Sequence, residues 1–510
     1  MANDASPMLN AYPDSLGGKL SDIAVLLSSE DFRGAFGAFY ILPSLFDTDL
    51  DRGFSVKSYG LNPELAKKKD LEALKDLGIT LKLDFVLNHA SVQSRQFWDL
   101  IDNVEYSKYR DFFIDWNRFW EGHGKMNTEG YIEPDEEMIA DMFFRKPGLP
   151  ILMVEFADGT KAPYWNTFYQ KIERVGGETR YLGQMDLNVK SPLVWDFYEE
   201  TLGKLAGYGA SIVRLDAFAY ASKEPGRRNF LNEPETWDIL ERLAGIGGRL
   251  GLTLLPEIHA AYSERTFERI ADKGYPTYDF FLPGLVIDAL ESGDGSALAR
   301  WALEIKEKGL KLVNMLGCHD GIPLLDLKGM LSDERISELI DTVVSRGGLV
   351  KNLHGKKNIY YQVNATYYSA LGESDGRLLL ARAIQLFMPG KPQIWYLDLF
   401  AGANDTTAVE KAGPDGHKEI NRTNLTHAQI EEGLKRDVVR RQLEMLKFRA
   451  SFPAFSFESL DSVCAEGSRL TLTHKNDGYT ATLSCDLKTC AFEITGTDKD
   501  GRAAYSFAHT

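Results

Sequence analysis

The chain has 510 residues, of which 44% are hydrophobic and 26% charged, a composition typical of a globular enzyme with a large core rather than of a disordered or fibrous protein. Its formal net charge of -16 argues against nucleic acid and anionic membrane surfaces as partners, because like charges repel. The first residues lack the basic start and apolar core of a signal peptide, and no apolar run is long enough to cross a bilayer, so we expect a cytoplasmic protein.

Short, nearly continuous apolar runs alternate with helix patterns over the first 450 residues or so. Such runs are typical of parallel strands covered on both faces, and they occur at residues 39–43, 79–87, 210–215, 252–256, 312–316 and 392–396. Helix patterns cover residues 193–208, 233–250 and 431–448. Repeated strand–helix units of this number predict an α/β protein with a (β/α)8 TIM barrel.

Two stretches interrupt this alternation, and a third region ends it. Residues 90–175 are too many for a βα loop and predict an inserted subdomain B, and residues 304–363 predict a second one, subdomain B′. From residue 451 to 510 the helix patterns give way to polar and apolar alternation, which predicts a C-terminal antiparallel β domain. The barrel would then comprise residues 1–89, 176–303 and 364–450.

Three acidic residues follow apolar runs: Asp216, Glu257 and Asp320. Strand ends hold the catalytic groups of barrel enzymes, because the strand fixes the side chain and the next loop exposes it. Retaining glycoside chemistry needs a carboxylate nucleophile, for which Asp216 is suited, and a protonated carboxyl, for which Glu257 is suited if poor solvation raises its pKa. Arg214 shares the strand face of Asp216 and would keep it ionised, while Asp320 would bind sugar hydroxyls in the transition state. The alternative is that each acid caps the following helix, but three acids beside His or Arg favour a catalytic function.

Four segments around these acids resemble the conserved regions of the α-amylase superfamily, glycoside hydrolase family thirteen. They are Asp84-Phe-Val-Leu-Asn-His89, Val213-Arg-Leu-Asp-Ala-Phe218, Pro256-Glu-Ile-His259 and Cys318-His-Asp-Gly321. Further segments are similar to the sucrose phosphorylase branch of that superfamily, among them Tyr12-Pro-Asp-Ser-Leu-Gly17, Asp51-Arg-Gly-Phe54 and Ile420-Asn-Arg422. The resemblance extends from about residue 8 to residue 455.

The resemblance implies a function for each matching residue. Asp216 matches the nucleophile, Glu257 the acid/base and Asp320 the transition-state stabiliser, with Arg214 and His319 orienting them. The other matching positions are Asp51, Phe54 and His89 for the donor glucose, Phe168, Tyr361 and Gln362 for the entry path, and Arg145, His259 and Arg422 for phosphate. The implied reaction is reversible, retaining transfer of glucose from sucrose to inorganic phosphate, giving α-D-glucose 1-phosphate and fructose, without metal or organic cofactor.

The identity of the acceptor stays open in the sequence. The loop before Tyr361 lacks the Leu-Asp pair that the resemblance leads us to expect, and carries His354, Lys356 and Lys357 instead. These charges favour an anionic acceptor, as in sucrose 6′-phosphate or glucosylglycerate, unless they belong to a solvated loop tip. Glucosylglycerol phosphorolysis and hydrolysis of α-glucosides are further alternatives, and a barrel without catalytic activity is disfavoured because all three acids are present.

No metal-ligand spacing, glycine-rich phosphate loop or dinucleotide fingerprint stands out, so we expect no metal and no cofactor. The four cysteines are expected to be reduced, with a Cys485–Cys490 bridge left open. The expected partners are a sugar and inorganic phosphate, bound by a monomer or a homodimer.

Overall fold

The computed structural model describes residues 5–142, 144–145, 148–175, 178–352, 360–413 and 416–510. Eight parallel strands form one sheet, and their order around the sheet follows their order in the chain. They are β1 (Met8–Ala11), β2 (Ala38–Ile41), β5 (Thr80–Val86), β13 (Ala210–Asp216), β14 (Thr253–Pro256), β15 (Thr277–Asp279), β16 (Leu312–Met315) and β19 (Lys391–Trp395). The two end strands, β14 and β15, lie next to each other, so the sheet is a near-closed barrel. The predicted TIM barrel is confirmed.

The sequence predicted six of the eight barrel strands and missed β1 and β15. Both are short, and each contains a buried polar residue, Asn10 in β1 and Asp279 in β15, that interrupts the apolar run. Asp279 accepts hydrogen bonds from the indole of Trp301 and from the first turn of the helix that follows, so its polarity is satisfied inside the core.

Helices follow most of the barrel strands. They are α1 (Leu20–Ser28), α2 (Lys68–Asp76), α6 (Pro192–Gly207), α7 (Glu235–Arg249), α8 (Thr266–Asp272), α9 (Leu282–Ser292), α10 (Ser296–Lys308), α13 (Asp375–Phe387), α14 (Tyr396–Leu399) and α15 (Thr406–Ala412). The prediction of one helix over residues 431–448 is wrong, because the structure has two helices there, α16 (His427–Lys435) and α17 (Asp437–Ser451). Arg436 between them is extended, and its guanidinium donates to the carbonyls of Phe400 and Ala401, which compensates the break.

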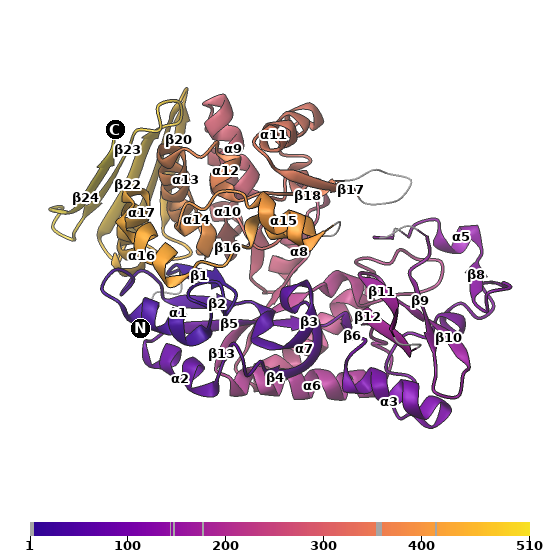
Figure 1. Cartoon of the computed structure of the whole chain (residues 1–510). Coiled ribbons are helices and arrows are strands. Elements are labelled where there is room, and N and C mark those ends of the chain that lie inside the picture. The colour runs from indigo at the N-terminus through magenta and orange to yellow at the C-terminus, as the bar shows by residue number, and fades with distance from the viewer. Residues whose placement is uncertain (1–4, 143, 146–147, 176–177, 353–359, 414–415) are drawn as a thin grey trace.

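The long segment after β5 lies to one side of the barrel (Figure 1). Its elements are β6 (His89–Ser91), α3 (Arg95–Asn103), α4 (Trp116–Phe119), β7 (Gly124–Met126), β8 (Ile132–Pro134), α5 (Glu136–Ile139), β9 (Ile151–Glu155), β10 (Lys161–Trp165), β11 (Gln170–Val175) and β12 (Glu178–Asp186). Trp116, Trp120 and Trp165 are fully buried in a core of their own. Because β12 pairs with both β6 and β11, the chain returns to the barrel along β12.

A second irregular segment follows β16. It contains the helix α11 (Asp333–Ser345), the hairpin β17 (Leu349–Asn352) and β18 (Tyr360–Asn364), and the short helix α12 (Tyr367–Ala370). The strand β16 itself belongs to the barrel sheet, although it lies inside the range predicted for subdomain B′.

The chain ends in a five-stranded antiparallel sheet, as predicted. Its strands are β20 (Leu460–Glu466), β21 (Arg469–Asn476), β22 (Tyr479–Asp486), β23 (Phe492–Thr497) and β24 (Ala503–His509), paired in chain order. Phe448 of α17 stacks on Tyr505 of the sheet, with 3.9 Å between ring centroids, and so joins the sheet to the barrel.

All four cysteines are free thiols. None of the helices in the described ranges has the length and apolarity needed to span a bilayer.

Candidate active site

The three predicted carboxylates line one cavity of about 680 Å³. Asp216 is the last residue of β13, Glu257 follows β14, and Asp320 lies in the loop after β16. Because these strands are parallel, their carboxyl ends meet at the same end of the barrel. The structure therefore brings together side chains that lie up to 104 positions apart in the chain.

The buried guanidinium of Arg214 lies beneath this cavity. Its Nη1 is 2.6 Å from Asp84 Oδ1 and 2.8 Å from Asp216 Oδ1, and its Nη2 is 2.6 Å from Glu257 Oε1. The strand register explains the contacts, since Arg214 lies opposite Asp84 on β5 and opposite Leu255 on β14, two residues before Glu257. The expected proximity of Arg214 and Asp216 on one strand face is observed, but the same cation also holds Glu257.

Because Arg214 contacts both Asp216 and Glu257, it influences the pKa values of both carboxyl groups. Burial raises the pKa of Asp216 well above its usual value, and the negative charge of Glu257 adds to the effect, although Arg214 opposes it. Burial disfavours ionisation of Glu257 as well, but Arg214 and His259 outweigh it and lower the pKa of Glu257 to about 2. The expectation that poor solvation raises the pKa of Glu257 is therefore wrong. Its cause is the direct pair with Arg214.

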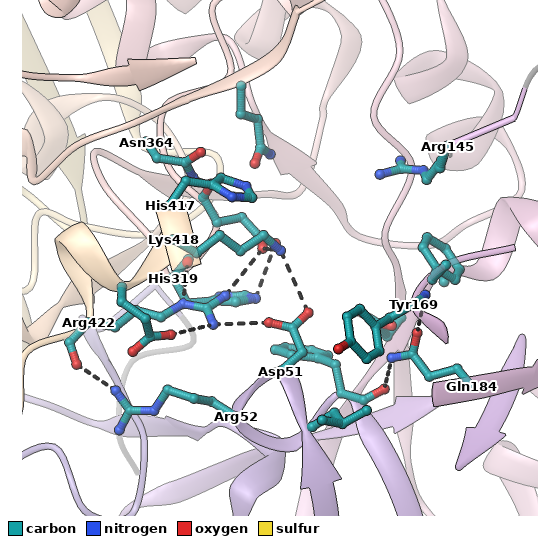
Figure 2. A pocket seen from close by; sticks show the side chains of 18 of the residues that line it. Asp51, Arg52, Arg145, Tyr169, Gln184, His319, Asn364, His417, Lys418 and Arg422 are labelled. Atoms are coloured by element: carbon teal, nitrogen blue, oxygen red, sulfur yellow. Dashed lines mark hydrogen bonds and ion pairs between the residues drawn. The ribbon is translucent and has the colours of Figure 1, made fainter. Parts of the chain in front are cut away.

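A second group of charges forms the side of the cavity shown in Figure 2. Arg422 Nη1 lies 3.0 Å from Asp51 Oδ1, and its Nε donates to the carbonyl of His319 at 2.9 Å. Lys418 Nζ lies 2.7 Å from Asp320 Oδ1 and 3.8 Å from Asp51 Oδ2. The ring of His319 approaches Asp320 Oδ2 at 3.1 Å through Nε2.

Asp51 and Phe54 are placed by a strained turn. Asp51 has φ 47°, a left-handed conformation that is uncommon for a non-glycine residue. At Gly53, where φ is 120°, a Cβ atom would lie 2.1 Å from the backbone nitrogen of Ser44, so only glycine fits. The turn leaves Phe54 stacked on His319, with ring centroids 4.9 Å apart and planes at 10°.

The long segment after β5 contributes a third side of the cavity. His89 Nε2 lies 2.9 Å from the carbonyl oxygen of Phe54, and its ring lies 5.0 Å from that of Phe168. Behind them, the fully buried pair of Lys223 and Asp186 is 2.8 Å apart. Asp186 also accepts from the backbone N–H of Thr167, next to Phe168, so this pair ties the segment to the barrel.

Arg145 lies across the cavity from Lys418 and Arg422 (Figure 2). Its Nε and Nη2 donate to Tyr220 Oη at 2.8 and 2.6 Å, and its guanidinium lies 5.3 Å from the ring centre of Phe168. We call Arg145, Phe168 and Tyr220 the Arg145 wall. The cavity thus has cationic groups on two opposite sides.

The remaining predicted residues are placed less uniformly. Gln362 lines the cavity. His259 is not among the lining residues: its Nδ1 lies 2.9 Å from Asp326 Oδ2, its ring stacks on Phe280 at 3.8 Å, and its Nε2 is 3.7 Å from Glu257 Oε1. Burial alone would lower the pKa of His259, but Asp326 and Glu257 raise it to about 9.

The backbone of Tyr361 belongs to β18, but its side chain is outside the described part of the structure. His354, Lys356 and Lys357 are also outside the described residues.

Sequence reasoning missed several residues that line the cavity: Arg52, Gln184, Tyr220, Asn364, His417, Lys418 and Glu419. Of these, Lys418 had a usable signal, because it precedes the matched segment Ile420-Asn-Arg422 by two positions and carries a charge. Gln184 and Tyr220 had no usable signal in the sequence, because isolated glutamine and tyrosine residues are common in all parts of a protein. In the described ranges we find no group of three or more His, Cys, Asp or Glu placed to hold a metal ion.

Comparison with known proteins places this cavity in a family. A scan against models of protein families gave no match. The chain is 56% identical over 497 residues to a sucrose 6(F)-phosphate phosphorylase from Ilumatobacter coccineus, covering 96% of this chain and 95% of that protein. It is 32% identical to a sucrose phosphorylase from Streptococcus mutans, covering 96% and 98%.

Among solved structures, a sucrose 6F-phosphate phosphorylase from Thermoanaerobacter thermosaccharolyticum has a TM-score of 0.88 at 32% identity, covering 100% of this chain and 98% of that one. These similarities extend over the barrel, both irregular segments and the C-terminal sheet. The chain therefore belongs to the sucrose phosphorylase branch of the α-amylase superfamily and is an enzyme of the glycosyl-transferring phosphorylase type.

Proposed function

We propose that this protein transfers glucose from sucrose 6F-phosphate, the 6′-phosphate considered above, to inorganic phosphate, with retention of configuration. The observation that carries the choice of donor is the 56% identity to the relative named for that substrate. The geometry supports the reaction class, because three carboxylates and cations on opposite sides of one cavity suit a sugar donor and an anionic acceptor.

The proposed first step uses Asp216 and Glu257. Glu257 gives its proton to the glycosidic oxygen while a carboxylate oxygen of Asp216 bonds to C1 of glucose, and fructose 6-phosphate leaves. Asp320 accepts hydrogen bonds from the sugar hydroxyls as the ring flattens. Because the pKa of Asp216 is raised and that of Glu257 is lowered while both contact Arg214, a proton must pass to Glu257 before it can act as the acid. Breaking the 2.6 Å contact between Arg214 and Glu257 would have this effect.

The proposed second step replaces the bond to Asp216. A phosphate oxygen attacks C1, the bond from C1 to Asp216 breaks, and Glu257 accepts the proton that the phosphate loses. Arg145 and Arg422 would attract the phosphate dianion, and Asp51, Phe54 and His89 would surround the glucose ring. The product is α-D-glucose 1-phosphate. No cofactor takes part in either step.

The decisive experiment compares donors at fixed phosphate concentration. Purified enzyme is incubated with sucrose 6F-phosphate, sucrose, glucosylglycerol or glucosylglycerate, and glucose 1-phosphate is quantified, with its anomer identified by NMR. We expect the highest kcat/KM for sucrose 6F-phosphate and the α-anomer. A higher kcat/KM for sucrose would reassign the donor, and failure with every donor would reject the class.

Sucrose is the second candidate donor, favoured by the similarity to the Streptococcus mutans enzyme. Hydrolysis is tested in the same experiment by omitting phosphate. Free glucose formed at equal rates with and without phosphate would identify a hydrolase instead.

We further propose that the enzyme acts in the cytoplasm, because a charged sugar phosphate does not cross a bilayer unaided and is therefore retained where it is made. Cell fractionation with an antibody tests this location.

We also propose that the protein is a monomer or a homodimer. Light scattering coupled to size-exclusion chromatography distinguishes the two.

A further inference from the structure

Lys418 is a cation of the cavity to which no function has been assigned. It lies in the short helix Gly416–Asn421, and its side chain points toward Asp51 (Figure 2). Nζ is 2.7 Å from Asp320 Oδ1 and 3.8 Å from Asp51 Oδ2. The side chain is 31% exposed, so its head group faces the cavity rather than the core.

Arg422, four residues further on, cannot replace it. The Arg422 side chain is 1% exposed and is held by Asp51 at 3.0 Å and by the carbonyl of His319 at 2.9 Å. Its Nη2 is 3.8 Å from Asp320 Oδ1, more than 1 Å farther than the ammonium of Lys418. Lys418 is therefore the cation in direct contact with Asp320, whereas Arg422 acts mainly on Asp51.

The contacts leave Asp320 able to bind a ligand. Lys418 approaches one carboxylate oxygen, Oδ1, and His319 approaches the other, Oδ2, at 3.1 Å. An ionised carboxylate accepts about four hydrogen bonds, so lone pairs remain for two sugar hydroxyls. A protonated Asp320 would instead carry a donor and lose part of this capacity.

We propose that Lys418 is a positioning residue of the glucosyl donor site, which keeps Asp320 ionised and oriented for the hydroxyls of the sugar. The inference rests on the proposed function, because it assigns Asp320 to the donor. It concerns glucosylation of the enzyme, the step common to every donor, and not the binding of phosphate.

The charges around Asp320 explain why one lysine matters. Beside the neutral side chains of Tyr12 and Cys318, the charged or basic groups that face it are His319 from its own loop, Lys418 and Arg422 from the segment after α15, Asp51 from the turn before β4 (Ser55–Leu61), Asp216 at the end of β13 and Glu257 directly after β14. Three of these six are carboxylates, which disfavour a further negative charge. Burial alone would raise the pKa of Asp320, but His319, Lys418 and Arg422 together lower it well below its usual value.

The test compares Lys418→Met, Lys418→Arg and Lys411→Met. Lys411 is exposed on α15, so its replacement removes one positive charge close in sequence without touching the cavity. The donor is α-glucosyl fluoride without phosphate, so that water takes the glucosyl group from Asp216, and kcat/KM for fluoride release reports glucosylation alone because this ratio covers only the steps up to the departure of fluoride. Circular dichroism and thermal midpoints show that each variant is folded.

We expect Lys418→Met to lower kcat/KM for α-glucosyl fluoride roughly 10- to 100-fold, the loss that follows removal of one charged hydrogen bond. The acid limb of its pH profile should move upward by about one unit, because Asp320 loses a cation in contact. Lys418→Arg should restore both within a few-fold, and Lys411→Met should match the wild type.

Two results would overturn the inference. One is an unchanged kcat/KM and acid limb in Lys418→Met. The other is normal fluoride release together with a raised KM for phosphate, which would make Lys418 a phosphate ligand. If Lys418→Met does not fold, Lys418→Gln, which keeps a polar group but no charge, decides by the same criteria. Failure of the proposed function looks different, because the wild type itself would form no glucose 1-phosphate from sucrose 6F-phosphate.

Discussion

The floor of the cavity and the Arg145 wall are built in different ways. The floor consists of Asp216, Glu257 and Asp320 with Arg214 below, and each of these residues lies on a barrel strand or within five residues of its end. The Arg145 wall combines Arg145 and Phe168, from irregular stretches of the long inserted segment, with Tyr220 from the short 3-10 helix that follows β13. Strands hold the floor in register through backbone hydrogen bonds, whereas the members of the wall, which come from separate segments, meet through side-chain contacts of Arg145 with Tyr220 and Phe168.

This difference separates chemistry from specificity. Barrel strands fix catalytic groups to within fractions of an ångström, and loops change the choice of substrate without disturbing them. Substitutions in the floor should therefore lower turnover with every donor, by a factor that depends on how much chemistry the leaving group requires. Substitutions in the Arg145 wall should affect some substrates and spare others.

The largest effect is expected for Asp216→Asn. Loss of the attacking carboxylate oxygen should lower kcat by at least about 10⁴-fold with every donor, because no covalent intermediate forms. Stopped assays over hours, with the thermal midpoint as a check on folding, measure this. Residual activity above about 1% would assign the nucleophile to another residue.

Glu257→Gln should be the next most severe change, and its effect should depend on the donor. Loss of the proton donor should lower kcat roughly 10²- to 10⁴-fold with sucrose 6F-phosphate, whose leaving group needs a proton. Fluoride leaves without one, so release from α-glucosyl fluoride should fall far less. Equal losses with both donors would argue against an acid function for Glu257.

Arg145→Met tests the wall. Removal of its guanidinium should raise the KM for phosphate roughly 10- to 100-fold, because a charged hydrogen bond to the dianion is lost. Fluoride release without phosphate should change by less than a factor of about three if the wall acts only on the acceptor. Tyr220→Phe is the matched control: it removes the oxygen that accepts from Arg145 Nε and Nη2 and keeps the guanidinium. A loss of fluoride release in Arg145→Met would show that the wall also serves the donor.

The same contrast explains what the sequence could predict. The barrel and the floor were accessible because apolar runs and the polar residues at their ends follow from the geometry of parallel strands, as Asp216 and Glu257 show. Lys418 and Tyr220 were not, since their positions depend on how distant loops fold over the strand ends. The shared pairing of Arg214 with both Asp216 and Glu257 was also inaccessible, because it depends on the neighbour relation of β13 and β14, which only the folded barrel provides.

The smallest effect is expected beneath the floor, at Lys82. This residue lies in β5, two positions before Asp84, and is fully buried. Its ammonium group donates to Tyr278 Oη and to Gln393 Oε1 and lies 3.8 Å from the ring centre of Tyr40. Burial lowers the pKa of Lys82 well below 10.5, and the positive charge of Arg214 adds to the effect.

The sign of the pH dependence follows from proton counts. Between the lowered pKa and 10.5, the unfolded chain binds more protons at Lys82 than the folded protein does, so the free energy of unfolding rises with pH through this window. Lys82→Met removes that rise, whereas Lys75→Met, at an exposed position on α2, should keep it. Urea midpoints at pH 7 and pH 9.5 measure the difference. Relative to the midpoint of Lys82→Met, the midpoints of the wild type and of Lys75→Met should be higher at pH 9.5 than at pH 7. A constant difference would mean that Lys82 stays charged in the folded protein, and that the floor rests on two buried cations, Lys82 and Arg214, instead of on Arg214 alone.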